Sequence, residues 1–96
     1  MTVRFLEVAR TELRDAVRFY EAQRPGLGAE FRDEVRSTIE RIKHLPEAWQ
    51  LLSEHTRRCR TRLFPYGVIY RVESKNILVV AIAHLHRHPE HWKDRP

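Results

Sequence analysis

The segment RRCRTRLFPYGVIYRVESKNILVVAIAHLHRHPEHW, from Arg57 to Trp92, decides the fold because it contains most of the predicted sheet. Residues 57–63 alternate between arginine and less polar side chains, as in a strand with two different faces. Residues 66–72 are rich in β-branched and aromatic side chains, and residues 77–83 form an unbroken apolar run. The polar residues 73–76 suit a hairpin loop. The segment therefore predicts three consecutive strands followed by a histidine-rich tail.

The N-terminal half predicts one edge strand, residues 2–8, and two helices. Residues 9–23 and 27–45 each carry apolar side chains at helical spacing. Arg24-Pro25-Gly26 separates the two helices, and so short a connection makes them an antiparallel hairpin. Pro46 ends the second helix, and residues 47–56 are expected to form the connection to the next strand. The outer face of the first helix is expected to carry solvated pairs among Arg10, Glu12, Arg14, Asp15 and Arg18.

These elements predict an α+β fold in the order β-α-α-β-β-β. The helical hairpin should pack on one face of a small, curved, mainly antiparallel sheet, since neither helix can bury its apolar stripe alone. Residues 77–83 are apolar on both sides, however, and the helices cover only one face. The tail, strong curvature of the sheet or a partner chain must cover the other face.

Length and composition indicate one small domain, residues 1–96, with 42% hydrophobic residues available for a core. The single cysteine, Cys59, excludes an intrachain disulfide and favours a reducing compartment. We expect no signal peptide, because Arg4 and Glu7 interrupt the only early apolar residues, and no membrane span, because no apolar run approaches the necessary length. Cys59 itself is expected to be a small buried residue.

Positive charge is concentrated in the predicted sheet. The net charge is +5, and residues 57–72 contain five arginines and no acid. Arg58, Arg60 and Arg62 should lie on one face of their strand, with Cys59, Thr61 and Leu63 on the other. A one-sided cationic sheet indicates a polyanionic partner, either a nucleic acid or an acidic protein segment. The alternative is a solvated arginine face that only aids solubility.

Several stretches resemble one known family in their order and spacing. They are Ala16–Glu21, Arg24–Phe31, Ile42–Glu47, Arg62–Tyr66, Val68–Val72 and Val79–His84. Together they cover nearly the whole chain and resemble the RelE/ParE superfamily of bacterial toxins from type II toxin–antitoxin systems. The resemblance implies a cytoplasmic toxin that a cognate antitoxin neutralises by wrapping around it. Acidic antitoxin segments would then pair with the arginine face.

The superfamily has two activities, cleavage of mRNA on the ribosome and poisoning of DNA gyrase. Gly67 stands where the nucleases usually have an arginine, and His86 and Trp92 stand where they often have an arginine and an aromatic hydroxyl. These departures favour a ParE-like protein that binds gyrase, and whether the protein is an enzyme stays open. The alternative is a ribosome-dependent mRNA endonuclease, with candidate residues Arg62, Arg71, His84 and His86. A third hypothesis is a non-toxic nucleic-acid- or protein-binding module.

The predicted partner-binding residues are Arg58, Arg60, Arg62, Arg71, Arg87 and Trp92. The tail also carries His84, His86, His88 and His91, and the first three would share one side if the last strand continued through them. We predict no metal site, because neither a second cysteine nor a carboxylate pair completes a set of ligands. No motif indicates a cofactor. Tyr70 is expected to be a core residue rather than a base-stacking one.

Overall fold

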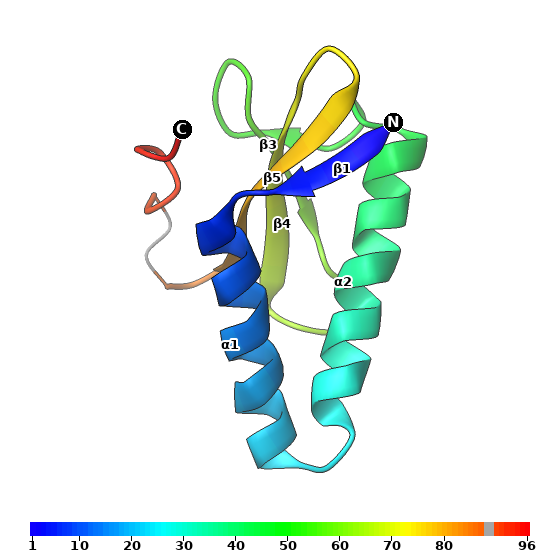
Figure 1. Cartoon of the computed structure of the whole chain (residues 1–96), viewed down its shortest axis with the longest axis vertical. Helices are drawn as coiled ribbons and strands as arrows, with labels where there is room; N and C mark the ends of the chain where they lie inside the picture. Colours follow the sequence, from blue (N-terminus) through cyan, green and yellow to red (C-terminus); the bar gives the residue numbers. More distant parts are fainter. Residues whose placement is uncertain (88–89) are drawn as a thin grey trace.

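The computed structural model describes residues 1–87 and 90–96, and one mixed sheet with two helices on one of its faces organises the chain (Figure 1). The strands are β1 (Thr2–Phe5), β2 (Gln50–Leu51), β3 (Arg57–Arg60), β4 (Tyr66–Val72) and β5 (Asn76–His84). Their order in the sheet is β1-β5-β4-β3-β2. β1 runs parallel to β5, and all other neighbours are antiparallel. The predicted fold class and the edge position of β1 are therefore confirmed.

The helices α1 (Glu7–Gln23) and α2 (Leu27–His44) form the predicted hairpin. Gly26 joins them in a left-handed conformation with φ 91°, which a glycine adopts without strain. The Glu21 carboxylate accepts hydrogen bonds from the backbone N–H groups of Gly26 and Gly28, with N–O distances of 3.0 to 3.1 Å. This carboxylate thus satisfies amides that the start of a helix otherwise leaves unpaired.

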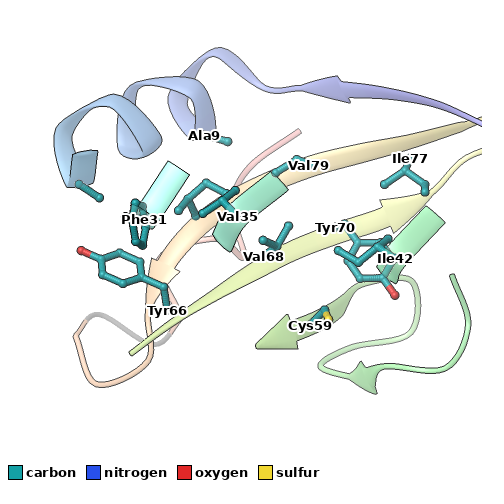
Figure 2. Close-up of a cluster of buried hydrophobic side chains, with 12 residues drawn as sticks. Ala9, Phe31, Val35, Ile42, Cys59, Tyr66, Val68, Tyr70, Ile77 and Val79 are labelled. Atoms are coloured by element: carbon teal, nitrogen blue, oxygen red, sulfur yellow. The ribbon is translucent and has the colours of Figure 1, made fainter. Parts of the chain in front are cut away.

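The main core fills the space between the helical hairpin and the sheet (Figure 2). α1 packs on β5, and α2 packs on β3 and β4. Figure 2 shows Phe31 and Val35 of α2 beside Val68 of β4, with Tyr70 further along that strand. The Tyr70 hydroxyl donates to the Pro46 carbonyl oxygen at 2.6 Å, and burial raises the pKa of Tyr70 to about 12. Tyr70 is therefore a core residue, as predicted.

The C-terminal tail packs against the face of the sheet that the helices leave uncovered, which we call the second face. A second buried cluster on this face consists of Ile69, Leu78, Val80, Ala81, Ala83 and Trp92, with Leu52 packed against it. Trp92 is only 7% exposed, and it belongs to the C-terminal residues 90–96 that Figure 1 draws in red. The chain's own tail, one of the three covers predicted for this strand, therefore packs on the second face.

A β-bulge in β5 shifts the alternation of its side chains. Ile69 pairs with Ala81 whereas Tyr70 pairs with Val79, so Val80 is an extra residue in the strand. Because of this extra residue, Ile82 returns to the helix-covered core although Val80 does not. Strict alternation along the sequence does not predict this change of face.

The first of the three predicted strands is shorter than residues 57–63. β3 ends at Arg60, and the Thr61 hydroxyl then donates to the Phe64 carbonyl oxygen at 2.7 Å inside a turn. The predicted alternation, which placed Leu63 on the same face as the buried Cys59, therefore fails at Leu63, whose side chain is 79% exposed. A polar residue that can bond backbone carbonyls thus ends the strand before its apolar neighbour can reach the core.

Two other boundaries differ from the sequence prediction. β1 ends at Phe5 rather than at Val8, because α1 already begins at Glu7. The connection 47–56 contains the short strand β2, in which Gln50 pairs with Arg58 and Leu51 with Arg57. A strand of two residues is too short to show a period in sequence.

We predict that Ile82→Asp prevents cooperative folding, whereas Leu63→Asp does not. Ile82 is 3% exposed, so an aspartate there places a carboxylate without a cationic partner in the core. That costs several kcal/mol, out of a total stability of about 5–15 kcal/mol for a domain. Leu63→Asp is the matched control and should change stability by less than about 0.5 kcal/mol. Thermal unfolding followed by circular dichroism measures both, and a parent-like melt of Ile82→Asp would contradict the placement of β5.

Candidate functional site

One carboxylate, that of Glu12, joins α1, β5 and the tail. The Ile82 backbone N–H donates to Glu12 Oε1 at 3.0 Å, and Arg95 donates to both carboxylate oxygens at 2.8 and 2.9 Å. His91 Nε2 lies 3.0 Å from Glu12 Oε2. Arg95 also donates to the Val80 carbonyl oxygen at 2.9 Å. These contacts hold the tail where Trp92 covers the second face of the sheet.

The environment of Glu12 favours its charged form. Burial acts to raise the pKa of Glu12, but the hydrogen bond from Arg95, the Ile82 N–H and the nearby positive charges outweigh burial and lower the pKa below 4.5. The prediction that Glu12 belongs to the solvated face of α1 is wrong, since its side chain is 23% exposed. Its spacing from Ala9 and Ala16, three residues after one and four before the other, is the sequence signal that places it beside the buried stripe.

The second face of the sheet carries Arg58 and Arg60, as predicted. Arg58 is opposite Ile69 on β4, and Arg60 is opposite Gly67. A Cβ atom on Gly67 would lie 2.9 Å from Cγ and Cδ of Arg58, so the arginine stem occupies that space. Glycine at this position therefore lets Arg58 lie across β4.

Burial lowers the pKa of Arg58, and the charge of Arg60 lowers it further. Arg58 donates to Gln50 Oε1 at 2.8 Å, which is an uncharged acceptor. Two neighbouring guanidinium groups thus remain on this face without a carboxylate between them in the part of the chain that the structure describes.

The remaining arginines of the predicted set do not all share this face. Arg62 lies in the loop after β3, where its backbone N–H donates to Glu34 Oε2 at 2.8 Å. The prediction that it continues the strand alternation of Arg58 and Arg60 is therefore wrong. Arg71 of β4 is opposite Leu78 of β5 and lies on the second face, at the end of β4 away from Gly67.

Some tail residues instead line a pocket of about 380 Å³ between α1 and the end of β5. His84, Arg87 and His91 line it together with Tyr66 and Glu12. The ring centroids of His84 and Tyr66 are 5.2 Å apart. Burial lowers the pKa of His84, and the charges of Arg87 and His86 lower it further, so the neutral imidazole is favoured at pH 7.

The candidate nuclease residues are not brought together. His84 pairs with Tyr66 at one end of the β4–β5 hairpin and Arg71 pairs with Leu78 near the other, about 17 Å along the strand. β5 ends at His84, so His86 does not continue it, and the His86 N–H donates to His84 Nδ1 at 3.1 Å. His88 lies outside the described residues.

Trp92 and Cys59, the other residues considered in the sequence, are both buried. Trp92 lies in the second buried cluster, and Cys59 is buried beneath α2, where Arg41 Nη1 lies 3.6 Å from its sulfur. Burial raises the pKa of Cys59, while the charges of Arg41 and Arg62 act in the opposite direction. Within residues 1–87 and 90–96, no three His, Cys, Asp or Glu side chains are placed to hold one metal ion. No helix in those residues is long and apolar enough to cross a membrane.

The fold and its arginine-bearing face define a small basic α+β protein in which the C-terminal tail packs against the sheet. Comparison with protein families then gives the family. The family model described as "ParE toxin of type II toxin-antitoxin system, parDE" matches residues 3–89, and the chain belongs to this family.

A solved structure supports the same fold. The chain is similar to one described as "Chromosomal ParDE TA system from P. aeruginosa", with a TM-score of 0.67 and 16% sequence identity. The similarity covers 88% of this chain and 96% of that one. Among curated proteins, none matches the sequence.

We predict that Glu12→Gln lowers stability by about 2 kcal/mol at pH 7, because charge-assisted hydrogen bonds to Arg95 are lost. A lowered native-state pKa stabilises the fold above the unfolded-state pKa, and this contribution is lost as the pH falls through the native-state pKa. The difference between parent and variant should therefore shrink below about pH 4.5. Urea unfolding at pH 7 and at acidic pH measures it, and an equal difference at both pH values would contradict the role of the Glu12 charge.

Proposed function

We propose that this protein is the toxin of a type II toxin–antitoxin pair, which acts in the cytoplasm by binding DNA gyrase and is neutralised by a cognate antitoxin. The observation that carries the proposal is the family match over residues 3–89. The similar solved structure is that of a ParDE toxin–antitoxin system, in agreement with an antitoxin partner. We further propose that residues 1–96 act as a single toxin domain that needs no cofactor.

Two placements favour binding over RNA cleavage. At Gly67, where the nucleases usually have an arginine, the stem of Arg58 fills the space over β4. Arg71 and His84, which would have to act on the same phosphate, lie at opposite ends of the β4–β5 hairpin. Proton transfer requires groups within hydrogen-bond reach of one reacting centre.

The second candidate function is a ribosome-dependent mRNA endonuclease. The pocket that holds His84, Arg87 and His91 beside Tyr66 favours it, since imidazole groups and a cation could act together on a phosphodiester. Glu12 already engages His91 at 3.0 Å, however, and binds the tail through Arg95. In this arrangement the carboxylate serves the structure of the tail, which is why we place binding first.

Induced expression without an antitoxin tests the choice between the two activities. If the protein poisons gyrase, DNA synthesis should stop first, with induction of the DNA-damage response, and purified protein should trap gyrase on cleaved DNA. Incorporation of labelled thymidine and methionine after induction measures the order of events. An early stop in translation with cleaved mRNA would contradict gyrase as the target, and no growth defect would favour a binding module without toxicity.

We predict that Arg60→Glu combined with Arg62→Glu weakens binding to the target or antitoxin at least about tenfold, without unfolding the protein. Both side chains are exposed, so the substitutions reverse surface charge without opening the core. The matched control is Arg18→Glu combined with Arg32→Glu, at exposed positions on α1 and α2. Binding equal to that of the control pair, with both variants folded, would exclude these arginines from the interface.

A further inference from the structure

A pocket of about 470 Å³ lies between the C-terminal half of α2 and the connection that follows this helix. Its lining residues are Ser37, Glu40, Arg41, His44, Leu45 and Trp49. Leu45 is 57% exposed, and Trp49 packs against the core between the helices and the sheet. The pocket therefore belongs to the helical layer, on the flank that α2 forms in Figure 1, and not to the second face of the sheet.

Hydrogen bonds and packing fix the floor of this pocket. The Arg41 guanidinium lies over the Trp49 ring, 5.6 Å from the ring centroid. Arg41 Nη2 donates to Thr38 Oγ1 at 3.0 Å and to the Arg60 carbonyl oxygen at 3.2 Å. The Trp49 carbonyl oxygen accepts from Arg57 at 2.8 Å. Tryptophan and arginine side chains that are already ordered lose little freedom on binding and are typical of the residues that contribute most to protein interfaces.

The exposed charges beside the pocket form a pattern that is complementary to itself. Arg36, Glu40 and Lys43 lie on one side of α2, and the exposed Glu47 follows the helix. Their charges in chain order are positive, negative, positive and negative. If two α2 helices run antiparallel about a two-fold axis at the midpoint of Glu40 and Lys43, each Glu40 is opposite a Lys43, and each Arg36 is opposite a Glu47. A two-fold interface requires such a pattern, because one surface must match a copy of itself.

The contact between Lys43 and Glu40 within one helix, at 3.4 Å, is compatible with this arrangement. Both side chains are well exposed, and a carboxylate can accept from two cations at once. Two copies of the pair would place four charges of alternating sign around the axis. The same axis brings the exposed Leu45 of one copy to the level of Thr38 of the other, beside Ser37. Ser37 lines the pocket, and its small side chain leaves space for a leucine.

We propose that α2 is the interface of a homodimer in which two α2 helices pack antiparallel and Leu45 of each copy enters the pocket of the other. The distribution of charge favours this flank. The chain has a net charge of +5, and copies that met through Arg58 and Arg60 would bring like charges together, whereas the stripe from Arg36 to Glu47 is balanced. The inference goes beyond the proposed function, because it concerns the helical layer and a second copy of the same chain.

Sedimentation velocity of the purified protein, at protein concentrations from about 10 µM to about 1 mM, measures the association. One pocket and a short charged stripe on each copy make a small interface, and small interfaces are weak. We therefore expect a change from monomer to dimer over this range, with a dissociation constant on the order of 100 µM.

Exchange of the two central charges tests the two-fold pairing. Glu40→Lys and Lys43→Glu should each raise the dissociation constant at least about tenfold, because each places like charges opposite one another on both sides of the axis. The double variant restores opposite charges at both positions and should dimerise as the parent does. Asp15→Lys on α1 is the matched control. Asp15 is exposed and pairs with Arg18 three residues later, as Glu40 does with Lys43, and both substitutions change the net charge equally.

Truncation of Leu45 tests the pocket. Leu45→Ala should raise the dissociation constant at least about fivefold, because it removes the apolar group that fills the pocket. Leu63→Ala is the matched control, since Leu63 is 79% exposed in the loop after β3. All of these positions are exposed, so thermal unfolding followed by circular dichroism should give parent-like melts. A change in association with an unchanged melt reports on the interface and not on the fold.

A parent protein that stays monomeric at about 1 mM would overturn the proposal and leave the pocket to a different partner. A double variant no tighter than its two single variants would overturn the antiparallel pairing, and so would Asp15→Lys as weak as Glu40→Lys. Equal association by Leu45→Ala and Leu63→Ala would overturn the role of the pocket. The induction experiment, which tests the proposed function, bears on none of these outcomes.

Discussion

The arrangement of the molecule depends on the Glu12 carboxylate, which binds three elements that are far apart in sequence. β5 is apolar on both faces, so it needs cover from α1 on one side and from the tail on the other. Glu12 accepts the Ile82 N–H of β5 at 3.0 Å and two hydrogen bonds from Arg95 of the tail. A single charged group on α1 therefore holds both the helix and the tail against β5.

The bulge at Val80 makes this junction possible. Because Val80 is an extra residue in β5, the strand changes face between Val80 and Ile82. The Ile82 N–H then reaches Glu12, and the Val80 carbonyl oxygen accepts from Arg95. With the tail held in this way, Arg58 and Arg71 share the second face of the sheet with it.

Sequence patterns predicted the elements that carry a clear period. β4 has the predicted bounds, Tyr66–Val72, and the helical hairpin and the edge strand β1 were also foreseen. The failures have local causes that composition does not reveal. Thr61 donates to a backbone carbonyl oxygen and ends β3 early, which leaves Leu63 exposed. β2 has only two residues, and its pairing with Arg57 and Arg58 of β3 defines it as a strand.

Of the candidate site, the sequence predicted the part that depends on strand alternation and missed the part that depends on long-range contacts. Strand alternation placed Arg58 and Arg60 on one face of their strand, with Cys59 on the other, and the pairing with Ile69 and Gly67 confirms this. The cluster at Glu12 could not be deduced from alternation, because it forms only when residues 70 or more positions apart meet. Alternation also gave no sign that Arg71 forms no ion pair within the described residues, since that depends on which neighbours the fold brings to it.

Hydrogen exchange of the Ile82 amide, measured by NMR on the native protein at neutral pH, tests the central claim most directly. This amide bonds to a side chain of α1, so its exchange reports on the junction of helix, strand and tail. The structure predicts exchange as slow as that of the neighbouring β5 amides, because opening it requires the Glu12 junction to break. Exchange at the rate of an exposed loop amide would contradict the claim that Glu12 holds both the helix and the tail against β5.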